Sequence, residues 1–215
     1  MGKLLAWLGL VVGVVALLTQ FVISMQSYAE AGRDIPGSLG MFFSYYTVLS
    51  NIVLVLIYLA ELTGVAWLGW FRSLDTRGMM VAAMLLVMTF VHIFLRGLTP
   101  KIGLFPLCDA LLHYVTPLIY FVWWIVGVKH GPLLVRRVPL MLVPTLVYFV
   151  YVLARGAWVG DYPYPVINVD RIGYPQTLLH AAAIAIGLGA LMLIVVGIDE
   201  VLGRWALRNQ RPAAG

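Results

Sequence analysis

The sequence predicts an all-α polytopic membrane protein: six transmembrane helices bundled in a single domain over residues 1–215. Hydrophobic residues make up 62% of the chain and charged residues 11%, and the mean hydropathy is +0.97. A soluble domain of this composition would have too little polar surface to cover it. A bilayer core about 30 Å thick needs ~20 apolar residues per helix, and the chain contains six stretches of roughly that length.

The expected helices span residues 4–25, 42–62, 79–98, 106–128, 139–155 and 177–198. The first is followed by Ala29-Glu30-Ala31, which resembles a signal-peptidase site. Because the apolar run from Leu4 to Met25 is longer than a signal-peptide core, we expect a retained helix. The fifth stretch contains Pro139 and Pro144. A proline is tolerated in a first helical turn, whereas the second proline predicts a kink.

The distribution of Lys and Arg predicts that both termini are cytoplasmic. With the N-terminus inside, the cytoplasmic side receives Lys3, Arg72, Arg77, Lys129, Arg136, Arg137, Arg204, Arg208 and Arg211. The outer side receives Arg33, Arg96, Lys101, Arg155 and Arg171, together with Glu30, Asp34, Asp161 and Asp170. This is the positive-inside pattern, with basic residues spread over short loops that contact anionic headgroups of membrane lipids. It gives no reason to expect a nucleic-acid partner, although the net charge is +5.

Four polar helix residues share a depth near the outer membrane face: Thr47, His92, His113 and His180. An ionisable side chain in hydrocarbon is costly unless it faces protein or water, so a common pocket would explain all four. Each also has a purely structural explanation. Threonine in a membrane helix most often bonds a carbonyl of the preceding turn, and a single histidine is as often an interhelical donor. For His180, close to the interface, the structural explanation is favoured.

Two polar stripes accompany this pocket. Ser44, Thr47 and Asn51 are spaced i, i+3, i+7, and Asp109, His113 and Thr116 are spaced i, i+4, i+7. Residues at these spacings lie on one face of a helix, and a polar face inside a membrane packs against protein. The two stripes therefore predict a polar pocket that opens toward the outer face.

The segments that carry these stripes also resemble a known family. They read FFSYYTVLSN at 42–51, DALLHYVTP at 109–117 and YPYP at 162–165, with Gly173-Tyr174 following. This ordered set resembles the prokaryotic branch of a six-span membrane family. Its animal relatives are the androgen-induced and androgen-dependent integral membrane hydrolases. The resemblance extends over nearly the whole chain and implies a multi-pass protein of the bacterial plasma (inner) membrane.

The resemblance also implies an activity. The animal members are threonine hydrolases that cleave fatty acid esters of hydroxy fatty acids, and their catalytic threonine and histidine match Thr47 and His113. The spacing from the histidine to the following proline and the connection between the two helices differ from the animal pattern. The implied substrate is therefore a lipid ester of this or a similar kind, and no cofactor is expected.

The chemistry of Thr47 and His113 can also be argued independently of the family resemblance. A threonine hydroxyl needs a neighbouring base to attack a carbonyl, and a neutral imidazole is suited to that task near pH 7. Thr47 would form an acyl-enzyme, and His113 would act as base and then as acid. For the oxyanion the candidates are Asn51 first and Ser44 second. Asp109 could orient the imidazole ring.

Two arginines near the outer ends of their helices have more than one interpretation. Arg96 and Arg155 could bind the free carboxylate of a fatty-acid-type substrate. They could equally extend toward lipid headgroups, and Asp109 could pair with either of them.

Two other classes of function remain open. His92, His113 and His180 could instead bind zinc in an intramembrane metallohydrolase, since three histidines with an open position form a known catalytic site. Alternatively, the chain could bind or transport lipid without catalysis, with Thr47 as a packing residue. The sequence contains no P-loop, dinucleotide fingerprint, serine-hydrolase elbow or HExxH zinc motif, and the single Cys108 gives no ligand spacing.

Overall fold

The computed structural model describes residues 1–95 and 102–209. In this part of the chain every regular element is a helix, and six helical segments are long and apolar enough to cross a membrane. They are Gly2–Glu30, Tyr46–Thr63, Leu74–Phe94, Phe105–Gly127, Val135–Val159 and Val169–Asn209. The predicted fold class, an all-α polytopic membrane protein, is confirmed.

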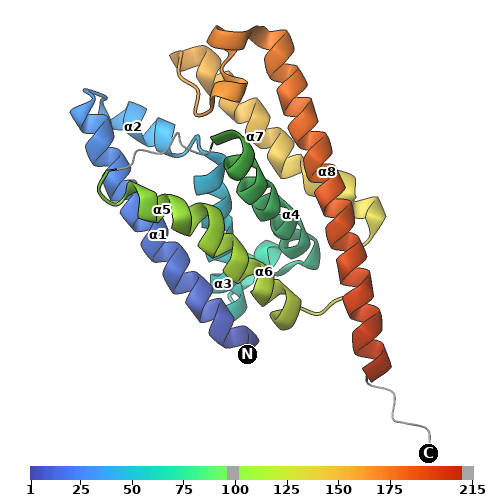
Figure 1. Ribbon diagram of the computed structural model, residues 1–215. Helices are drawn as coiled ribbons and strands as arrows, with labels where there is room; N and C mark the ends of the chain where they lie inside the picture. The colour runs from blue at the N-terminus through green and yellow to red at the C-terminus, as the bar shows by residue number, and fades with distance from the viewer. Residues whose placement is uncertain (96–101, 210–215) are drawn as a thin grey trace, which may run out of the picture.

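The helices surround a central one (Figure 1). Helix α4 (Leu74–Phe90) contacts α3 (Tyr46–Thr63), α6 (Thr116–Gly127), α7 (Val138–Val159) and α8 (Val169–Asn209). Helix α1 (Gly2–Glu30) packs on the other side of the bundle from α8, against α3 and α6. The start of α1 and the end of α8 lie at the same end of the bundle, as six crossings require.

Close packing between α1 and α3 depends on a glycine. A Cβ added at Gly9 would lie 2.2 Å from Cζ of Tyr58 on α3. Tyr58 in turn stacks edge-on against Tyr120 and Trp123 of α6, and all three rings are buried. In a bilayer, where lipid chains are as apolar as the core, this contact supplies association energy because small residues let backbones approach.

The second apolar stretch is divided into two helices, which corrects the predicted helix at 42–62. A short helix α2 (Ile35–Phe42) begins at Asp34, whose Oδ1 accepts a hydrogen bond from the Gly37 amide at 2.9 Å. The chain then turns, and α3 starts at Tyr46. The prediction missed the turn because its one polar residue, Ser44, lies between two aromatic residues, Phe43 and Tyr45, so hydropathy shows no clear break there.

Helix α8 also differs from the prediction of 177–198. It starts at Val169, has a non-helical Gly173 with φ of 74°, and continues to Asn209. A positive φ favours glycine, which accounts for the bend at that residue. A search for stretches of about 20 apolar residues detects only the part of this helix that crosses the hydrocarbon core of the bilayer. Helix α7 likewise exceeds the predicted 139–155, and Pro144 lies inside it.

Two further segments carry π-helical turns. Helix α4 continues into η2 (Val91–Leu95), and α5 (Phe105–Ala110) continues through η3 (Leu111–Val115) into α6. The predicted third helix extended to residue 98, and its last part lies outside the described residues. Such turns are rare and are frequently found at functional sites.

A buried cluster of hydrogen bonds at the opposite end from α2 joins α8 to the loop after α6. His130 Nδ1 lies 2.9 Å from Asp199 Oδ1, and the amides of Gly131 and Leu133 donate to Asp199 Oδ2 at 2.9 and 3.0 Å. The Asp199 side chain is 2% exposed. No pattern in the sequence indicates this contact between His130 and Asp199, which stabilises the predicted cytoplasmic end of the bundle.

Candidate functional site

Thr47 and His113 lie in contact near the α2 end of the bundle. Thr47 is the second residue of α3, and its Oγ1 lies 3.1 Å from Nε2 of His113. The threonine is 7% exposed, and the histidine side chain is 18% exposed. A hydroxyl and an imidazole at this distance can exchange a proton. The shared depth predicted from the sequence thus corresponds to a direct contact.

The imidazole of His113 is oriented on its other side by Asp109. His113 Nδ1 lies 3.0 Å from the Asp109 backbone carbonyl oxygen and 3.0 Å from its carboxylate Oδ1. Two acceptors at Nδ1 place the ring proton there, which leaves Nε2 as the acceptor for the Thr47 hydroxyl. This is the arrangement in which a histidine acts as a base, with a carboxylate behind it.

His113 lies in the π-helical turn η3, and the sequence explains the distortion. Pro117 has no backbone N–H and its ring disturbs the preceding turn, so a regular α-helical bond to the His113 carbonyl cannot form. Instead the Thr116 amide donates to the carbonyl of Leu111, five residues earlier. The wider turn changes the direction in which the side chains of this segment point relative to an unbroken helix.

Asn51, the first oxyanion candidate, bridges the segments that carry Thr47 and His113. Its Nδ2 donates to the carbonyls of Thr47 at 2.8 Å and Leu112 at 3.1 Å, and its Oδ1 accepts from Thr116 Oγ1 at 2.5 Å. The residue is 1% exposed and its amide is fully engaged, so its bonds fix α3 against η3. Ser44, the second candidate, lies in the turn before α3, and its hydroxyl donates to the Met41 carbonyl at 2.7 Å. The expected stripe of Ser44 with Thr47 on one helix is therefore wrong.

Tyr164 is a site residue that the sequence analysis did not select. It lies in the loop between α7 and α8, and its hydroxyl oxygen accepts a hydrogen bond from the Tyr46 amide at 3.0 Å. The same oxygen interacts with the hydroxyl and the amide of Thr47. Burial raises the pKa of Tyr164 to about 12, so the phenol retains its proton at neutral pH. Its O–H is thus a hydrogen-bond donor beside Thr47.

A cavity of about 330 Å³ opens on the His113 side of this group. Thr47, Asp109, His113 and Tyr164 contribute to one wall. The facing wall comes from α1 and carries Gln20, Ser24, Ser27 and Tyr28. The size is within the range of small-molecule sites, and the polar residues on both walls suit a partly polar ligand. The spacing of Gln20, Ser24 and Ser27 (i, i+4, i+7) was the sequence signal that could have revealed this wall.

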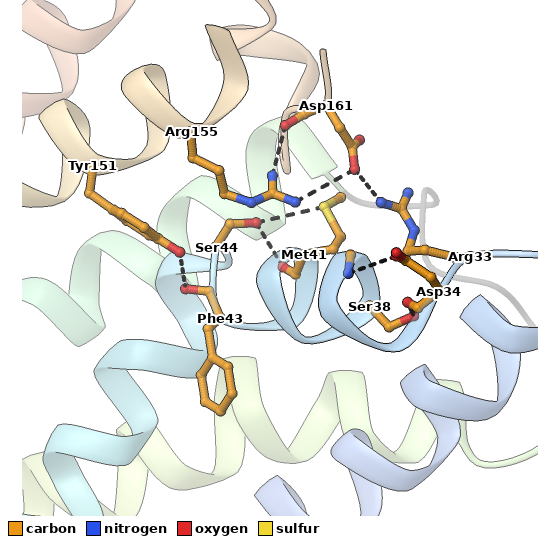
Figure 2. A network of polar contacts seen from close by, with 10 residues as sticks. Arg33, Asp34, Ser38, Met41, Phe43, Ser44, Tyr151, Arg155 and Asp161 are labelled. Carbon is orange, nitrogen blue, oxygen red and sulfur yellow. Dashed lines mark hydrogen bonds and ion pairs between the residues drawn. The ribbon is translucent and has the colours of Figure 1, made fainter. Parts of the chain in front are cut away.

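An ionic cluster holds the Tyr164 loop in place. Figure 2 shows Arg33 and Arg155 approaching Asp161 from two sides. Arg33 Nη1 lies 2.6 Å from Asp161 Oδ2, and Arg155 Nη1 donates to the Asp161 backbone carbonyl at 2.8 Å. Arg155 thus makes a contact within the protein, and it does not line the cavity. The other predicted carboxylate ligand, Arg96, lies outside the described residues.

The remaining histidines of the predicted pocket lie apart from this site. His92 is exposed on η2. His180 Nδ1 contacts the Val166 carbonyl at 2.7 Å, and its Nε2 lies 2.8 Å from the Gln176 amide nitrogen, so this residue fastens α8 to the Tyr164 loop. Within residues 1–95 and 102–209, no three His, Cys, Asp or Glu side chains lie close enough to bind a metal ion. The three-histidine ligand set of the zinc alternative is not assembled.

Comparisons with protein-family models, with curated proteins and with solved structures find no match to this chain. The family named above therefore remains a resemblance carried by the residues at 42–51, 109–117 and 162–165. What can be said of function depends on the contacts among Thr47, His113, Asp109 and Tyr164.

Proposed function

We propose that this multi-pass membrane protein hydrolyses lipid esters, with Thr47 as nucleophile and His113 as general base and acid. The observation that carries the proposal is the 3.1 Å contact between Thr47 Oγ1 and His113 Nε2, with Asp109 behind the ring. The same three roles occur in hydrolases on unrelated folds, where geometry rather than sequence position identifies them. The bacterial plasma membrane is the location that the family resemblance suggests.

The reaction has two halves. His113 Nε2 takes the proton of the Thr47 hydroxyl while Oγ1 bonds to the ester carbonyl carbon, and the carbonyl oxygen becomes an oxyanion. When this intermediate collapses, the bond to the alcohol oxygen breaks and His113 returns the proton to that oxygen. In the second half His113 accepts a proton from water, which attacks the acyl-threonine. The acid leaves and the proton returns to Thr47.

Tyr164 is our candidate donor to the oxyanion. Its oxygen accepts the Tyr46 amide proton, which leaves its O–H as a donor, and it lies beside Thr47 in the wall of the cavity. Asn51 and Ser44 are less suitable because their donors are used within the protein. Removing one oxyanion donor typically lowers kcat by about 10²–10³-fold. Tyr164→Phe should therefore lower kcat in that range, and it should also destabilise the protein by about 1–3 kcal/mol because the Tyr46 amide loses its acceptor.

The substrate is a lipid ester of the kind that the resemblance implies, such as a fatty acid ester of a hydroxy fatty acid. The cavity lies near one membrane face beside apolar walls, and this position supports a substrate that enters from the bilayer. The test is hydrolysis of such an ester by the purified protein in lipid vesicles. Thr47→Ala and His113→Ala should each lower turnover at least about a hundredfold.

A matched control is Thr63→Ala. Thr63 is on the same helix at its opposite end, and its hydroxyl donates to the Leu59 carbonyl at 2.7 Å. This variant should hydrolyse the ester at the wild-type rate. Full turnover in folded Thr47→Ala would disprove the nucleophile assignment. Absence of ester hydrolysis in the wild type would favour the lipid-binding alternative.

A further inference from the structure

Thr47 separates two hollows of different chemistry. On one side is the larger cavity described above, which we call the polar cavity because its polar side chains gather there, although Phe42, Val48, Phe105 and Leu112 also line it. On the other side is a smaller volume of about 60 Å³ that we call the apolar slot. The slot is walled by Leu86, Val87 and Phe90 of α4, Tyr148 and Phe149 of α7, and Ile184 of α8. Thr47 and Tyr164 line both hollows. An ester carbonyl at Thr47 would therefore extend one substituent into each.

The hydroxyl groups in the slot wall are already paired with protein. Tyr46 and Thr145 share a hydrogen bond of 2.9 Å between their hydroxyl oxygens, and the Tyr148 hydroxyl donates to the Ser44 carbonyl at 3.0 Å. An occupant of the slot therefore meets mainly hydrocarbon and aromatic faces. A polar group placed there would lose its hydration without gaining a partner, whereas an alkyl chain would not.

The position of the slot also suits a chain. Leu86, Phe90 and Ile184 are half-buried, so the slot reaches toward the lipid-facing surface of α4 and α8. Its small volume of about 60 Å³ favours an unbranched chain over a branched group. A chain longer than the slot could continue into the surrounding hydrocarbon.

The position of His113, the proposed acid and base, determines which half of the ester lies in the cavity and which lies in the slot. His113 lines the polar cavity and not the slot. Because the protonated His113 must reach the departing alcohol oxygen, that oxygen leaves on the cavity side. The acyl group then remains on Thr47 with its chain on the slot side. Water for the second half of the reaction enters through the polar cavity.

We propose that the apolar slot binds the unbranched acyl chain of an ester, and that the polar cavity binds its alcohol. The inference rests on the proposed hydrolase function and specifies its substrate as a fatty acyl ester whose alcohol half carries polar groups, as a hydroxy fatty acid does through its carboxylate. Gln20, Ser24 and Ser27 on α1 supply amide and hydroxyl groups toward that alcohol. The apolar character of the slot and the position of His113 carry this assignment independently of the family resemblance.

The first test narrows the slot and measures the acyl-chain preference. Ile184→Phe adds volume in the slot, and Ile186→Phe is the control because Ile186 is on the same helix and 74% exposed. Each variant is assayed with acetyl, octanoyl and palmitoyl esters of p-nitrophenol. We expect Ile184→Phe to lower the ratio of kcat/KM for palmitoyl over acetyl at least about tenfold. Ile186→Phe should leave the ratio unchanged.

The reciprocal variant fills the polar cavity instead. Ser27→Phe should alter the preference between glyceryl and methyl esters and leave the acyl-chain ratio unchanged. The assignment is overturned if Ser27→Phe changes the acyl-chain ratio and Ile184→Phe does not. It is also overturned if neither variant changes any preference while Thr47-dependent hydrolysis persists.

A binding measurement separates failure of this assignment from failure of the hydrolase proposal. Palmitic acid with a terminal diazirine is photolysed with the full-length protein in vesicles, and the modified residues are mapped by mass spectrometry. Modification at Leu86, Phe90 or Ile184 that is reduced in Ile184→Phe supports the slot, whether or not esters are cleaved. Modification confined to residues 20–28 of α1 would overturn the assignment even in an active enzyme.

Discussion

Substitution of Asn51 tests whether this residue positions the proposed catalytic pair, Thr47 and His113, or takes part in the proposed chemistry itself. Its amide makes two bonds across the interface of α3 with the η3–α6 segment, to the Leu112 carbonyl and from the Thr116 hydroxyl. Substitution with leucine keeps the side-chain volume similar and removes both bonds. The third bond, to the Thr47 carbonyl, lies within α3, where that carbonyl also accepts a bond from Ser50.

The magnitude follows from these contacts. Interhelical hydrogen bonds in membrane proteins contribute about 0.6 kcal/mol on average and up to about 1.7 kcal/mol. Two of them give a destabilisation of about 1–3 kcal/mol for Asn51→Leu. The Thr116 hydroxyl can turn toward the Leu112 carbonyl, 3.4 Å away, which limits the loss. Because a misplacement of about 1 Å can cost about a hundredfold in rate, kcat should fall by about 10–100-fold.

The assay pairs thermal denaturation in detergent with ester hydrolysis in vesicles. Ser50→Ala is the control, since the Ser50 hydroxyl bonds only carbonyls of its own helix, at 2.7 and 3.2 Å. Ser50→Ala should leave both the denaturation temperature and the rate of ester hydrolysis close to their wild-type values. If Asn51→Leu lost activity a hundredfold while its denaturation temperature stayed at the wild-type value, the positioning argument would be refuted. Asn51 would then act on the oxyanion directly.

Three other substitutions test separate parts of the structure. Gly9→Ala places a methyl group against the Tyr58 ring and should destabilise the protein by about 1–3 kcal/mol in thermal denaturation. Asp199→Ala leaves His130 and two backbone amides without their buried partner, so it should cost about 3–5 kcal/mol in the same assay. Asp109→Asn should lower kcat by about 10–100-fold. The Asp109 backbone carbonyl, which also bonds the histidine ring, is retained in this variant.

Each of these substitutions has a matched comparison. A Cβ at Gly187 would have nothing within 4 Å, so Gly187→Ala should leave the free energy of unfolding within about 1 kcal/mol of the wild-type value. An equal effect at Gly187 and Gly9 would contradict the close-approach argument. The folded fraction of Asp199→Ala should retain wild-type kcat because Asp199 lies at the far end of the bundle. Unchanged kcat in Asp109→Asn would remove the carboxylate from the mechanism.

The sequence was sufficient for the fold class because six apolar stretches in a chain of this composition admit few other arrangements. It also predicted that Thr47 and His113 share a depth, since depth follows from counting residues along each helix. Contact between them could not be predicted, because counting does not say which helices are neighbours. The structure supplies that information through Asn51, which joins the two segments.

Other features of the site lay beyond hydropathy and spacing. The turn before α3 consists of Phe43, Ser44 and Tyr45, and a single serine between two aromatic residues occurs in membrane helices as well as in turns. The π-helical turn at His113 depends on Pro117, whose presence predicts a distortion but not its form. Tyr164 lies 118 residues after Tyr46 along the chain, and only folding brings it into contact with Tyr46 and Thr47.

The central claim is that Thr47 is a nucleophile activated by His113, and covalent trapping tests it most directly. The wild-type protein in vesicles is treated with an alkyl fluorophosphonate, which loses fluoride when an activated hydroxyl bonds to its phosphorus, and the modified peptide is identified by mass spectrometry. The adduct should be on Thr47, and the rate of its formation should fall at least about a hundredfold in His113→Ala. A protein that hydrolyses esters but carries the adduct on another residue, or labels equally fast without His113, would contradict the claim.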